Sequence, residues 1–494
     1  MKTNVIILII LISALIGCQK TSEVSIYGKI NGNIPDTITY SVPVNGVSYF
    51  GFRESVKPDS LGNFQIKLDL KEPAFIIITV PGISPKIIIV EPGEIFNILI
   101  NKENKSESFK ISGANEIGQN LYNTLPNPFS VQTEAKSFIK EISLDSIKRK
   151  ISILKADDIS KFSELLKKRE ISRTFFNLIS IDRDCYYATL TATVQYIKFV
   201  INLYGTAPGN HYEFPPDMKK MWEEVYLEYL PTQANFLKSH WWYDYTTTYL
   251  NCKEYLSESF TSQNISDIKD KGLYHTHNLD EAKKYLTGQT LEYYEAAYIY
   301  YWSMDLAYEK EFIQIFKQFK TDFPDSKYIK YIVPWINSII EFHKVTDADF
   351  NEKTKFIDDY EKIGSLKEGV KSLRGKKIYV DLWATWCEPC KYEFVKKDSL
   401  IRQLRSKGIE FLYISIDVDK RDKLWKDMIK YYNLQGYHIR AGTQLQADLR
   451  RIFSQNHKGS FYIPYHILID ENGNIIKNGI ESQTEIEEFN KLLK

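Results

Sequence analysis

Two cysteines, Cys387 and Cys390, lie between an apolar segment and a segment of helical spacing in "YVDLWATWCEPCKYE". A CxxC pair in this place puts its first thiol at a helix N-terminus, where unpaired backbone N–H groups and the helix dipole favour the thiolate. The second cysteine, one turn later, can form or resolve a disulfide with the first. Pro389 suits the first helical turn, where its missing N–H costs little. The spacing predicts a redox-active disulfide, with Cys387 as nucleophile and Cys390 as resolving thiol.

An aspartate, Asp381, interrupts the apolar strand six residues before Cys387. Burial among apolar neighbours is expected to raise the pKa of this carboxyl group. It could then move a proton for Cys390 when a mixed disulfide is resolved. The alternative interpretation is a carboxylate at the strand end that backbone N–H groups or a lysine satisfy.

The stretch "VDLWATWCEPC" resembles the thioredoxin active-site signature, and "WATWCEPCKYE" resembles the membrane-linked TlpA/ResA-type branch of thiol-disulfide oxidoreductases. The resemblance covers roughly residues 356–494. It implies that Glu393 tunes the thiols and that Pro464 is the family's cis-proline, facing the disulfide. Tyr465 stands where the family usually has threonine, and the branch often has asparagine at the position of Asp381. The implied substrate groove consists of Trp386, Glu388, Pro389, Ile463 and Pro464.

One of the two residues between the cysteines bears on the direction of electron flow. Glu388 places a negative charge there, and a nearby negative charge disfavours the thiolate. With the carboxyl groups of Asp381 and Glu393, this favours a reductant, although Glu388 could instead complement the helix dipole. A disulfide oxidase or isomerase uses the same cysteine pair at a higher reduction potential, and this alternative stays open.

The redox chemistry has consequences for cofactors and partners. The cysteines Cys387 and Cys390 carry the electrons themselves, so no dissociable cofactor is expected. The resemblance implies protein thiol or disulfide substrates, with apocytochrome in cytochrome c biogenesis and other periplasmic thiols as candidates. It also implies a membrane-embedded electron donor that recharges the pair.

Metal and peroxidase chemistry fit the sequence less well. A zinc site needs a second CxxC or two well-spaced histidines, whereas His438, His457 and His466 are scattered. A thioredoxin-fold peroxidase would present one cysteine in a Pro and Thr setting. The pair His275 and His277 in "YHTHN" lacks a third ligand and is interpreted as a polar loop. No metal site is therefore expected.

The first residues form a targeting signal. Lys2 precedes the apolar run Val5–Ile16, which is too short for the roughly 20 residues that span a bilayer, and Gly17 and Cys18 follow. This is the secretory pattern, and "LIGC" resembles the bacterial lipoprotein signal, in which Cys18 is acylated. An ordinary signal peptide with a chance cysteine is the alternative. We expect a lipid-anchored protein of the cell envelope that faces the periplasm, at the inner or the outer membrane.

The charge balance excludes binding by a general electrostatic field. Without residues 1–17, which contain one lysine and no acid, the chain has 63 basic and 63 acidic side chains. Such a chain does not attract nucleic acid or anionic lipid over a distance. Membrane attachment would therefore depend on the acyl chains of Cys18.

The sequence predicts a multidomain protein after the signal at residues 1–17. Short alternating runs separated by turn formers predict an all-β sandwich over residues 18–114, similar to the β-rich module ahead of thioredoxin-like domains in bacterial lipoproteins. Apolar residues every three or four positions predict an all-α region over residues 115–345. Strands alternating with helices predict a C-terminal α/β thioredoxin-like fold over residues 346–494, with one antiparallel hairpin at "ENGN" and a closing helix "TEIEEFNKLL".

The helical region raises two further questions. Its aromatic clusters, "HWWYDYTTTY" and "YYEAAYIYYW", could line a glycan or peptide groove, but their spacing favours core. Cys185 and Cys252 could form a disulfide or remain two buried free thiols. The functional alternative of another class is an envelope binding or scaffold protein whose first 345 residues do the biological work, with the redox domain as an accessory.

Overall fold

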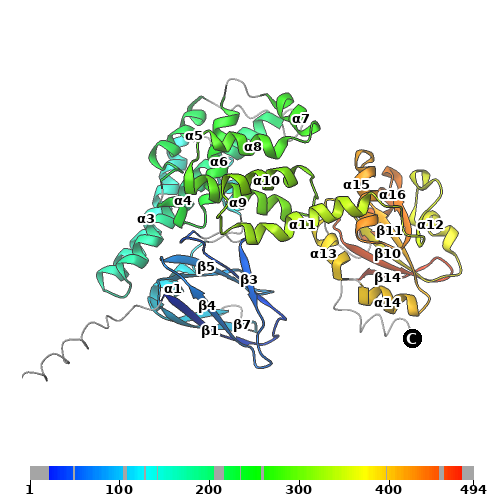
Figure 1. The fold of residues 1–494 in the computed structure, drawn as a ribbon, viewed down its shortest axis with the longest axis horizontal. Coiled ribbons are helices and arrows are strands. Elements are labelled where there is room, and N and C mark those ends of the chain that lie inside the picture. The colour runs from blue at the N-terminus through cyan, green and yellow to red at the C-terminus, as the bar shows by residue number, and fades with distance from the viewer. Residues whose placement is uncertain are drawn as a thin grey trace, which may run out of the picture. The chain divides into compact units, whose positions relative to one another are not determined.

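The structure is a computed structural model (Figure 1). It describes residues 22–47, 51–103, 108–126, 130–141, 143–204, 216–233, 235–257, 261–396, 398–454 and 461–480. The predicted signal peptide, Cys18, His457 and the closing helix lie outside these residues. The chain forms two compact units, one up to Tyr300 with Gln318–Ile332 and one of Tyr301–Lys317 with Val333 onward. The predicted parts were three. In the structure, the β-sandwich and most of the helical region form the first unit, and the helical segments Tyr301–Lys317 and Val333–Thr346 belong to the second.

The first unit begins with the predicted β-sandwich. Its strands are β1 (Glu23–Asn31), β2 (Ile38–Ser41), β3 (Arg53–Val56), β4 (Asn63–Asp69), β5 (Ala74–Thr79), β6 (Lys86–Val90), β7 (Ile95–Asn101) and β8 (Phe109–Gly113). They form two four-stranded sheets, in the orders β4-β1-β7-β8 and β3-β2-β5-β6. Alternate residues of β4 are buried, and one apolar cluster draws on both sheets. The two sheets therefore enclose a common core.

Helices follow the sandwich in the chain. They are α1 (Glu116–Tyr122), α2 (Val131–Ala135), α3 (Leu144–Lys167), α4 (Arg173–Tyr204), α5 (Pro216–Glu228), α6 (Trp242–Tyr255), α7 (Ser262–Asp270), α8 (Tyr274–Lys283), α9 (Gly288–Met304), α10 (Glu311–Asp322) and α11 (Ile329–Thr346). Within the described part of the chain, none of the helices is both long enough and apolar enough for a membrane span.

The aromatic clusters are core, as predicted. Trp242, Tyr245, Tyr293 and Tyr298 are all buried, and the rings of Trp242 and Tyr293 stack with centroids 5.1 Å apart. The interpretation of "YHTHN" as a loop is wrong, because both histidines lie in the first turn of α8. Tyrosine and glutamate partners from other helices hold their rings there: Nδ1 of His275 lies 2.9 Å from the Tyr298 hydroxyl, and Nε2 of His277 lies 2.8 Å from Glu254.

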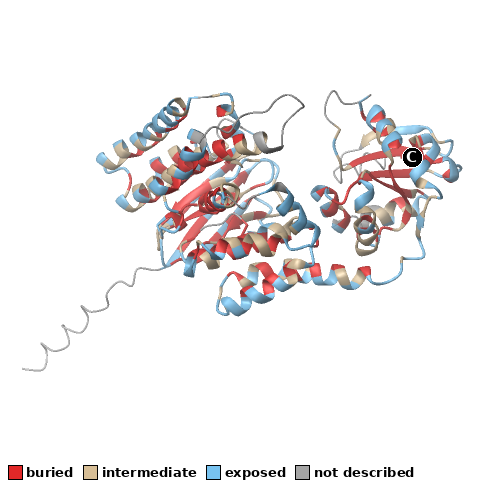
Figure 2. Ribbon diagram, turned by 90° about the horizontal axis from the view of Figure 1, so that it is seen from above, coloured by how far each residue is buried: buried red, intermediate tan, exposed pale blue. Residues whose placement is uncertain are grey.

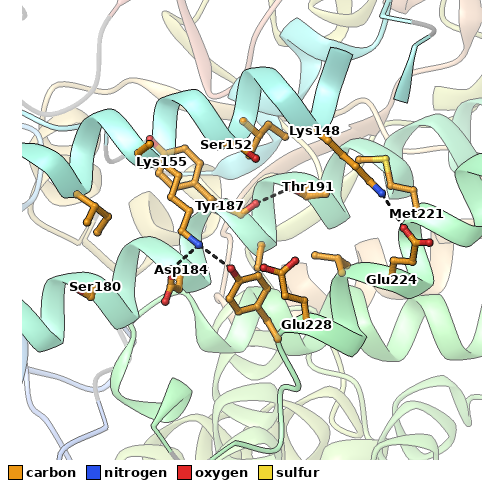
Figure 3. Close-up of a pocket in the computed structure, with 16 residues that line it drawn as sticks. Lys148, Ser152, Lys155, Ser180, Asp184, Tyr187, Thr191, Met221, Glu224 and Glu228 are labelled. Carbon is orange, nitrogen blue, oxygen red and sulfur yellow. Dashed lines mark hydrogen bonds and ion pairs between the residues drawn. The ribbon is translucent and has the colours of Figure 1, made fainter. Parts of the chain in front are cut away.

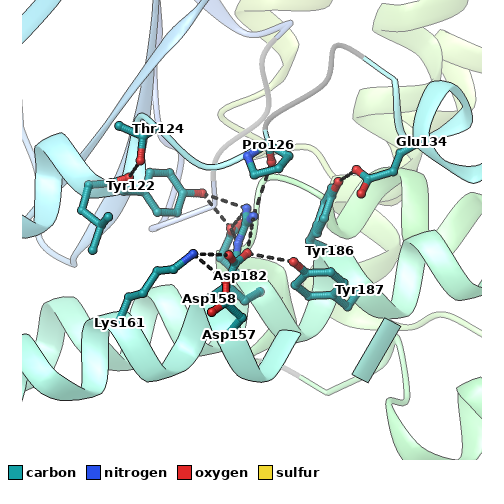
Figure 4. Close-up of polar contacts among 12 residues, drawn as sticks. Tyr122, Thr124, Pro126, Glu134, Asp157, Asp158, Lys161, Asp182, Tyr186 and Tyr187 are labelled. Atoms are coloured by element: carbon teal, nitrogen blue, oxygen red, sulfur yellow. Dashed lines mark hydrogen bonds and ion pairs between the residues drawn. The ribbon is translucent and has the colours of Figure 1, made fainter. Parts of the chain in front are cut away.

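A buried polar network joins α1 and α4 (Figure 4). Asp182 accepts hydrogen bonds from the Tyr122 hydroxyl and from Arg183, each at 2.7 Å. Burial opposes its charge, but His240 and Arg183 hold the pKa of Asp182 well below its usual range. Nearby, Cys185 and Cys252 are two buried free thiols rather than a disulfide. Burial raises the pKa of Cys252 to about 12, so this thiol is not a reactive one.

The second unit contains a six-stranded mixed sheet in the order β14-β13-β10-β11-β12-β9. Its strands are β9 (Thr354–Phe356), β10 (Ile378–Trp383), β11 (Glu410–Ser415), β12 (Gly436–Arg440), β13 (Tyr465–Ile469) and β14 (Ile475–Ile480). Its helices are α12 (Leu366–Gly369), α13 (Glu388–Lys396), α14 (Asp398–Ser406), α15 (Asp422–Tyr431) and α16 (Thr443–Ser454). The strands β9 to β12 pair in parallel, and β13 and β14 are antiparallel, as the "ENGN" turn predicts.

The central strand β10 is buried along its whole length, and Figure 2 shows buried strands within this sheet. On one face, Val380 and Leu382 join an apolar cluster with residues of α12 and α16. On the other face, the ring of Trp383 meets the ring of Phe394 from α13, with centroids 5.1 Å apart. Because side chains alternate along a strand, Asp381 lies on the α13 face. The predicted fold class, with its C-terminal α/β domain, is confirmed.

Candidate active site

The two cysteines form a disulfide at the start of α13. Cys387 immediately precedes the helix, and the Cα atoms of Cys387 and Cys390 are 5.3 Å apart. The backbone N–H of Cys390 donates to the Cys387 sulfur at 3.2 Å, and the N–H of Lys391 donates to the Cys387 carbonyl at 3.2 Å. The side chains are 4% and 1% exposed. The helix N-terminus is therefore in contact with the predicted nucleophilic sulfur and would stabilise its thiolate after reduction.

Asp417 fixes the loop before the disulfide. Its carboxylate accepts from the Thr385 N–H at 2.8 Å, from the Thr385 hydroxyl at 2.7 Å and from the Ser415 hydroxyl at 2.7 Å. Arg421 donates to the Thr385 hydroxyl at 3.1 Å. This role of Asp417 was not predicted from the sequence. The signal was an aspartate just after a parallel strand, at the edge of the sheet where the CxxC loop also emerges.

Asp381 and Glu393 meet a third ionisable side chain, that of His466. Nε2 of His466 lies 3.4 Å from Oδ1 of Asp381 and 3.3 Å from Oε2 of Glu393. Asp381 lies inside β10 rather than at its end, directly opposite His466 of β13 in the strand register. Glu393 lies one turn beyond Cys390 on the same face of α13. The two predicted carboxyl groups are thus brought together, and the histidine between them was not predicted.

The surroundings of this cluster are apolar and aromatic. The ring of Tyr379 stacks on the ring of His466, with centroids 5.3 Å apart. Burial, and then the charges of Asp381 and Glu393, hold the pKa of Tyr379 well above its usual value. Burial likewise raises the pKa of Tyr413, opposite Asp381 on β11. The carboxyl groups therefore lie in a region of low dielectric constant, where the helix that carries the disulfide packs on the sheet.

The predicted groove residues lie at the same edge of the sheet as the disulfide. The peptide bond from Ile463 to Pro464 is cis, as the resemblance implied. Tyr465 pairs with Leu382, so Pro464 lies beside the end of β10, from which the CxxC loop emerges. Trp386 is 54% exposed. Glu388 and Pro389 are also exposed, whereas Ile463 and Pro464 are partly covered.

A buried lysine follows the second cysteine. Lys391 is 2% exposed, and its Nζ donates to the backbone carbonyl oxygens of Asp305 and Leu306 at 2.6 and 3.2 Å. Burial lowers the pKa of Lys391. These contacts lie within the second unit and attach the active-site helix to the segment that precedes α10. The sequence contains no signal for this partner, which is more than 80 residues distant in the chain.

Two further features of the described residues concern ligands. No group of three or more His, Cys, Asp or Glu side chains could hold a metal ion in this part of the chain. A pocket of about 630 Å³ lies among α3, α4 and α5 (Figure 3). Within it, Nζ of Lys155 lies 2.6 Å from Asp184 and 2.7 Å from the Tyr229 hydroxyl, so these polar groups already satisfy one another.

Comparisons with known proteins concern the second unit. The Redoxin family model matches residues 359–493. The thiol-disulfide oxidoreductase ResA of Bacillus thuringiensis subsp. konkukian is 27% identical over 124 residues, which are 25% of this chain and 66% of ResA. ResA of Bacillus subtilis is 26% identical over 125 residues, 25% of this chain and 64% of ResA. This chain therefore spans slightly less than two thirds of the length of these curated relatives.

One solved structure is a thiol:disulfide interchange protein of the thioredoxin family from Chlorobium tepidum TLS. It is 22% identical to this chain. The match covers 25% of this chain and 81% of that one, with a TM-score of 0.21.

Proposed function

We propose that the protein exchanges electrons with protein disulfides through Cys387 and Cys390. The premise is that the C-terminal part of this chain belongs to the thioredoxin-like, TlpA/ResA-type thiol-disulfide oxidoreductases. The observation that carries this proposal is the disulfide itself. It lies at the N-terminus of α13, with the carboxyl groups of Asp381 and Glu393 beneath it and the cis-proline Pro464 at the same sheet edge.

The reaction proceeds by two thiol-disulfide exchanges. In the reduced protein, the Cys387 thiolate attacks one sulfur of a substrate disulfide, and the other substrate sulfur leaves as a thiolate that takes up a proton. The Cys390 thiol then gives its proton to a carboxylate of Asp381 or Glu393, and its sulfur attacks the Cys387 sulfur. The mixed disulfide breaks, the second substrate sulfur leaves as a thiolate, and the Cys387–Cys390 disulfide forms. Two electrons have then passed to the substrate.

We propose a reductant rather than an oxidant. Glu388 lies in the first turn of α13, and the two buried carboxyl groups lie beneath it. Negative charge on this side opposes the Cys387 thiolate and therefore destabilises the reduced state. A disulfide oxidase or isomerase is the alternative within the same fold.

The place of action is proposed from the sequence alone. The "LIGC" stretch supports acylation of Cys18 and attachment to an envelope membrane, with the redox domain facing the periplasm. In that compartment, thiols tend to become oxidised, so the protein needs a source of electrons. A membrane-embedded donor is the proposed partner, and the oxidised thiols of apocytochrome and of other periplasmic proteins are the proposed substrates.

The proposal is tested with the full chain and insulin as the disulfide substrate, with dithiothreitol as the source of electrons. We expect Cys387→Ser to abolish the catalysed reduction. We expect Cys390→Ser, reduced and freed of dithiothreitol before insulin is added, to accumulate a mixed disulfide with insulin. The matched control is Cys252→Ser, which removes a buried free thiol and should keep wild-type activity. Wild-type activity in Cys387→Ser would refute the proposal.

A second candidate function rests on the pocket among α3, α4 and α5. Its volume of about 630 Å³ falls in the range of small-molecule sites, and its lining mixes apolar and polar side chains, which favours an envelope binding protein with an accessory redox domain. A strain that carries Cys387→Ser and Cys390→Ser separates the two functions. Loss of the cellular phenotype supports the redox function, whereas a wild-type phenotype assigns the main role to the first unit.

A further inference from the structure

A histidine lies between the two carboxyl groups beneath the disulfide. The single nitrogen Nε2 of His466 is 3.4 Å from Asp381 and 3.3 Å from Glu393. All three side chains are largely buried, with exposures of 2%, 1% and 12% in the order His466, Asp381 and Glu393. The exchange steps described above give His466 no part, so its presence in this position requires a physical explanation.

The backbone builds this arrangement. Asp381 and His466 are direct neighbours across the antiparallel pair of β10 and β13, where the side chains of opposed residues point to the same face. Glu393 projects onto them from α13. The ring of Tyr379 lies against the imidazole from two positions along β10 and fixes its plane. The register of the two strands and the stacked ring therefore hold the three groups together.

Electrostatics require a proton within this cluster. Two buried carboxylates that share one site cannot both remain ionised without a positive partner. An unprotonated Nε2 would also direct its lone pair at two carboxyl oxygens. An imidazole is the group that most readily takes up a proton near neutral pH, and a positive charge there is paired with both carboxylates.

Among the described residues, the other tyrosine and histidine side chains on this face of the sheet do not supply that charge. Burial keeps Tyr379 and Tyr413 neutral by raising the pKa of each. His438 on β12 is also neutral at pH 7, because burial lowers its pKa to about 4. Arg405 of α14 acts on Tyr413, where it opposes the rise of the pKa, and the β14 residue that pairs with His466 is the apolar Ile480.

We propose that His466 is a positioning residue of the redox site, whose imidazolium holds the carboxyl groups of Asp381 and Glu393 together. One of them is then available to accept the Cys390 proton during resolution. The same positive charge offsets part of the negative charge beneath Cys387 and so preserves its thiolate. This inference rests on the proposed function, since it assigns a role within the same exchange reaction.

The test is the pH dependence of Cys387 alkylation by iodoacetamide in the reduced full chain, followed on the Cys387 peptide by mass spectrometry. The change His466→Gln retains an N–H donor but removes the charge. We expect it to raise the midpoint of the alkylation profile by about one pH unit, which is about tenfold less thiolate near neutral pH. In a background of Asp381→Asn and Glu393→Gln, the same change should cause no shift.

The matched control is His438→Gln. His438 is equally buried, stacks on Tyr413 and binds the Leu434 carbonyl, but it has no carboxylate partner among the contacts described. It should lose stability without a shift of the midpoint. An unchanged midpoint in His466→Gln, or an equal shift in His438→Gln, would overturn the inference.

Two further measurements distinguish a failure of this inference from misfolding of the variant and from a failure of the proposed function. If His466→Gln does not fold, the ring nitrogens of His466 are observed by NMR in the wild-type chain, where we expect a protonated imidazole at pH 7. A neutral imidazole at pH 7 would overturn the inference. Wild-type protein whose Cys387 reduces no insulin would refute the proposed function itself, and the inference would fall with it.

Discussion

Glu388 and Pro389, the two residues between the cysteines, are both exposed at the start of α13. The charge of Glu388 acts on Cys387 in addition to the dipole of the helix. These two effects have opposite signs for the thiolate, since the helix N-terminus stabilises it and the carboxylate opposes it. The redox poise of the pair therefore depends on a small difference that single substitutions can change.

We expect Glu388→Gln to raise the reduction potential by on the order of 10–20 mV, because removal of an exposed negative charge stabilises the Cys387 thiolate by a fraction of a kcal/mol. The measurement is equilibration of the full chain with glutathione and dithiothreitol. The control is Glu471→Gln in the turn after β13, at the opposite edge of the sheet, which should leave the potential unchanged. A lower potential in Glu388→Gln would contradict the assigned role.

At the level of single residues, the sequence predicted those that belong to a contiguous motif. Cys387, Cys390 and the cis-proline Pro464 are where the pattern indicated. His466 was missed because its meaning depends on the register of β10 against β13, which no local spacing reveals. Asp417 was missed for a related reason, since its partners in the CxxC loop are brought close only by the parallel pairing of β10 and β11.

At the scale of helices and strands, α13 contacts the segment before α10, and the sequence did not indicate this contact. Lys391 is the residue after Cys390, and its ammonium group is buried against two carbonyl oxygens of the segment before α10. Burying an ammonium group costs free energy, which these hydrogen bonds offset. The position of the active-site helix is therefore linked to a segment far away in the chain.

We expect Lys391→Met to destabilise the second unit by about 1–3 kcal/mol, because two buried carbonyl groups lose their donor. The free energy is measured from the urea dependence of hydrogen exchange in peptides of α13 and β10. Lys430→Met serves as the matched control. This lysine donates to the single carbonyl of Thr346 at 3.0 Å and is less buried, so the loss should be smaller. Equal effects of the two changes would contradict the account.

The strand β12 carries a pH-sensitive element, His438. Burial lowers its pKa to about 4 from an ordinary value of 6.5, so the folded state binds the proton less well than the unfolded state does. Stability is therefore fully present above pH 6.5 and is lost as the pH falls toward 4, by roughly 3 kcal/mol. We expect His438→Gln to flatten this dependence in urea unfolding at pH 7, 6 and 5. Parallel pH profiles for the two proteins would show that His438 is not responsible.

The start of α8 shows where residue spacing fails to predict a helix. The spacing in "YHTHN" carried no clear signal, and the segment was interpreted as a loop, yet it begins α8. The partners that hold it there, Tyr298 and Glu254, lie in other helices. Tertiary contacts of this kind override local preference. The aromatic stretches were predicted as core because aromatic residues in helices are usually buried, and in α6 and α9 the buried side chains lie all round the helix.

At the scale of the whole molecule, the second unit is larger than the predicted C-terminal domain. It includes Tyr301–Lys317 and the part of α11 from Val333 onward. There, the ring of Tyr308 stacks on Phe342 with centroids 4.3 Å apart, and it also meets Tyr431 of α15 at 4.9 Å. A domain boundary at the charged segment near residue 346 misses these contacts. The composition of a segment indicates that it is exposed, but it does not show which earlier helices pack on the domain that follows.

A fragment of residues 301–494 should therefore be more stable than a fragment of residues 349–494. The shorter fragment loses the stacking on Tyr431 and both acceptors of Lys391. We expect its melting temperature to be lower by at least about 5 °C, since a difference of 1 kcal/mol shifts a small domain by roughly this amount. Equal melting temperatures by circular dichroism would show that the helical segments contribute nothing to the redox domain.

The reduction potential of the Cys387/Cys390 pair in the full chain tests the central claim most directly. It is measured by equilibration against glutathione and then dithiothreitol, with the two states separated by thiol alkylation. We predict a value of about −270 mV or lower, near that of thioredoxin, as expected for a reductant with carboxyl groups beneath its disulfide. A value near about −120 mV would make the protein a disulfide donor and would contradict the role assigned here to Glu388, Asp381 and Glu393.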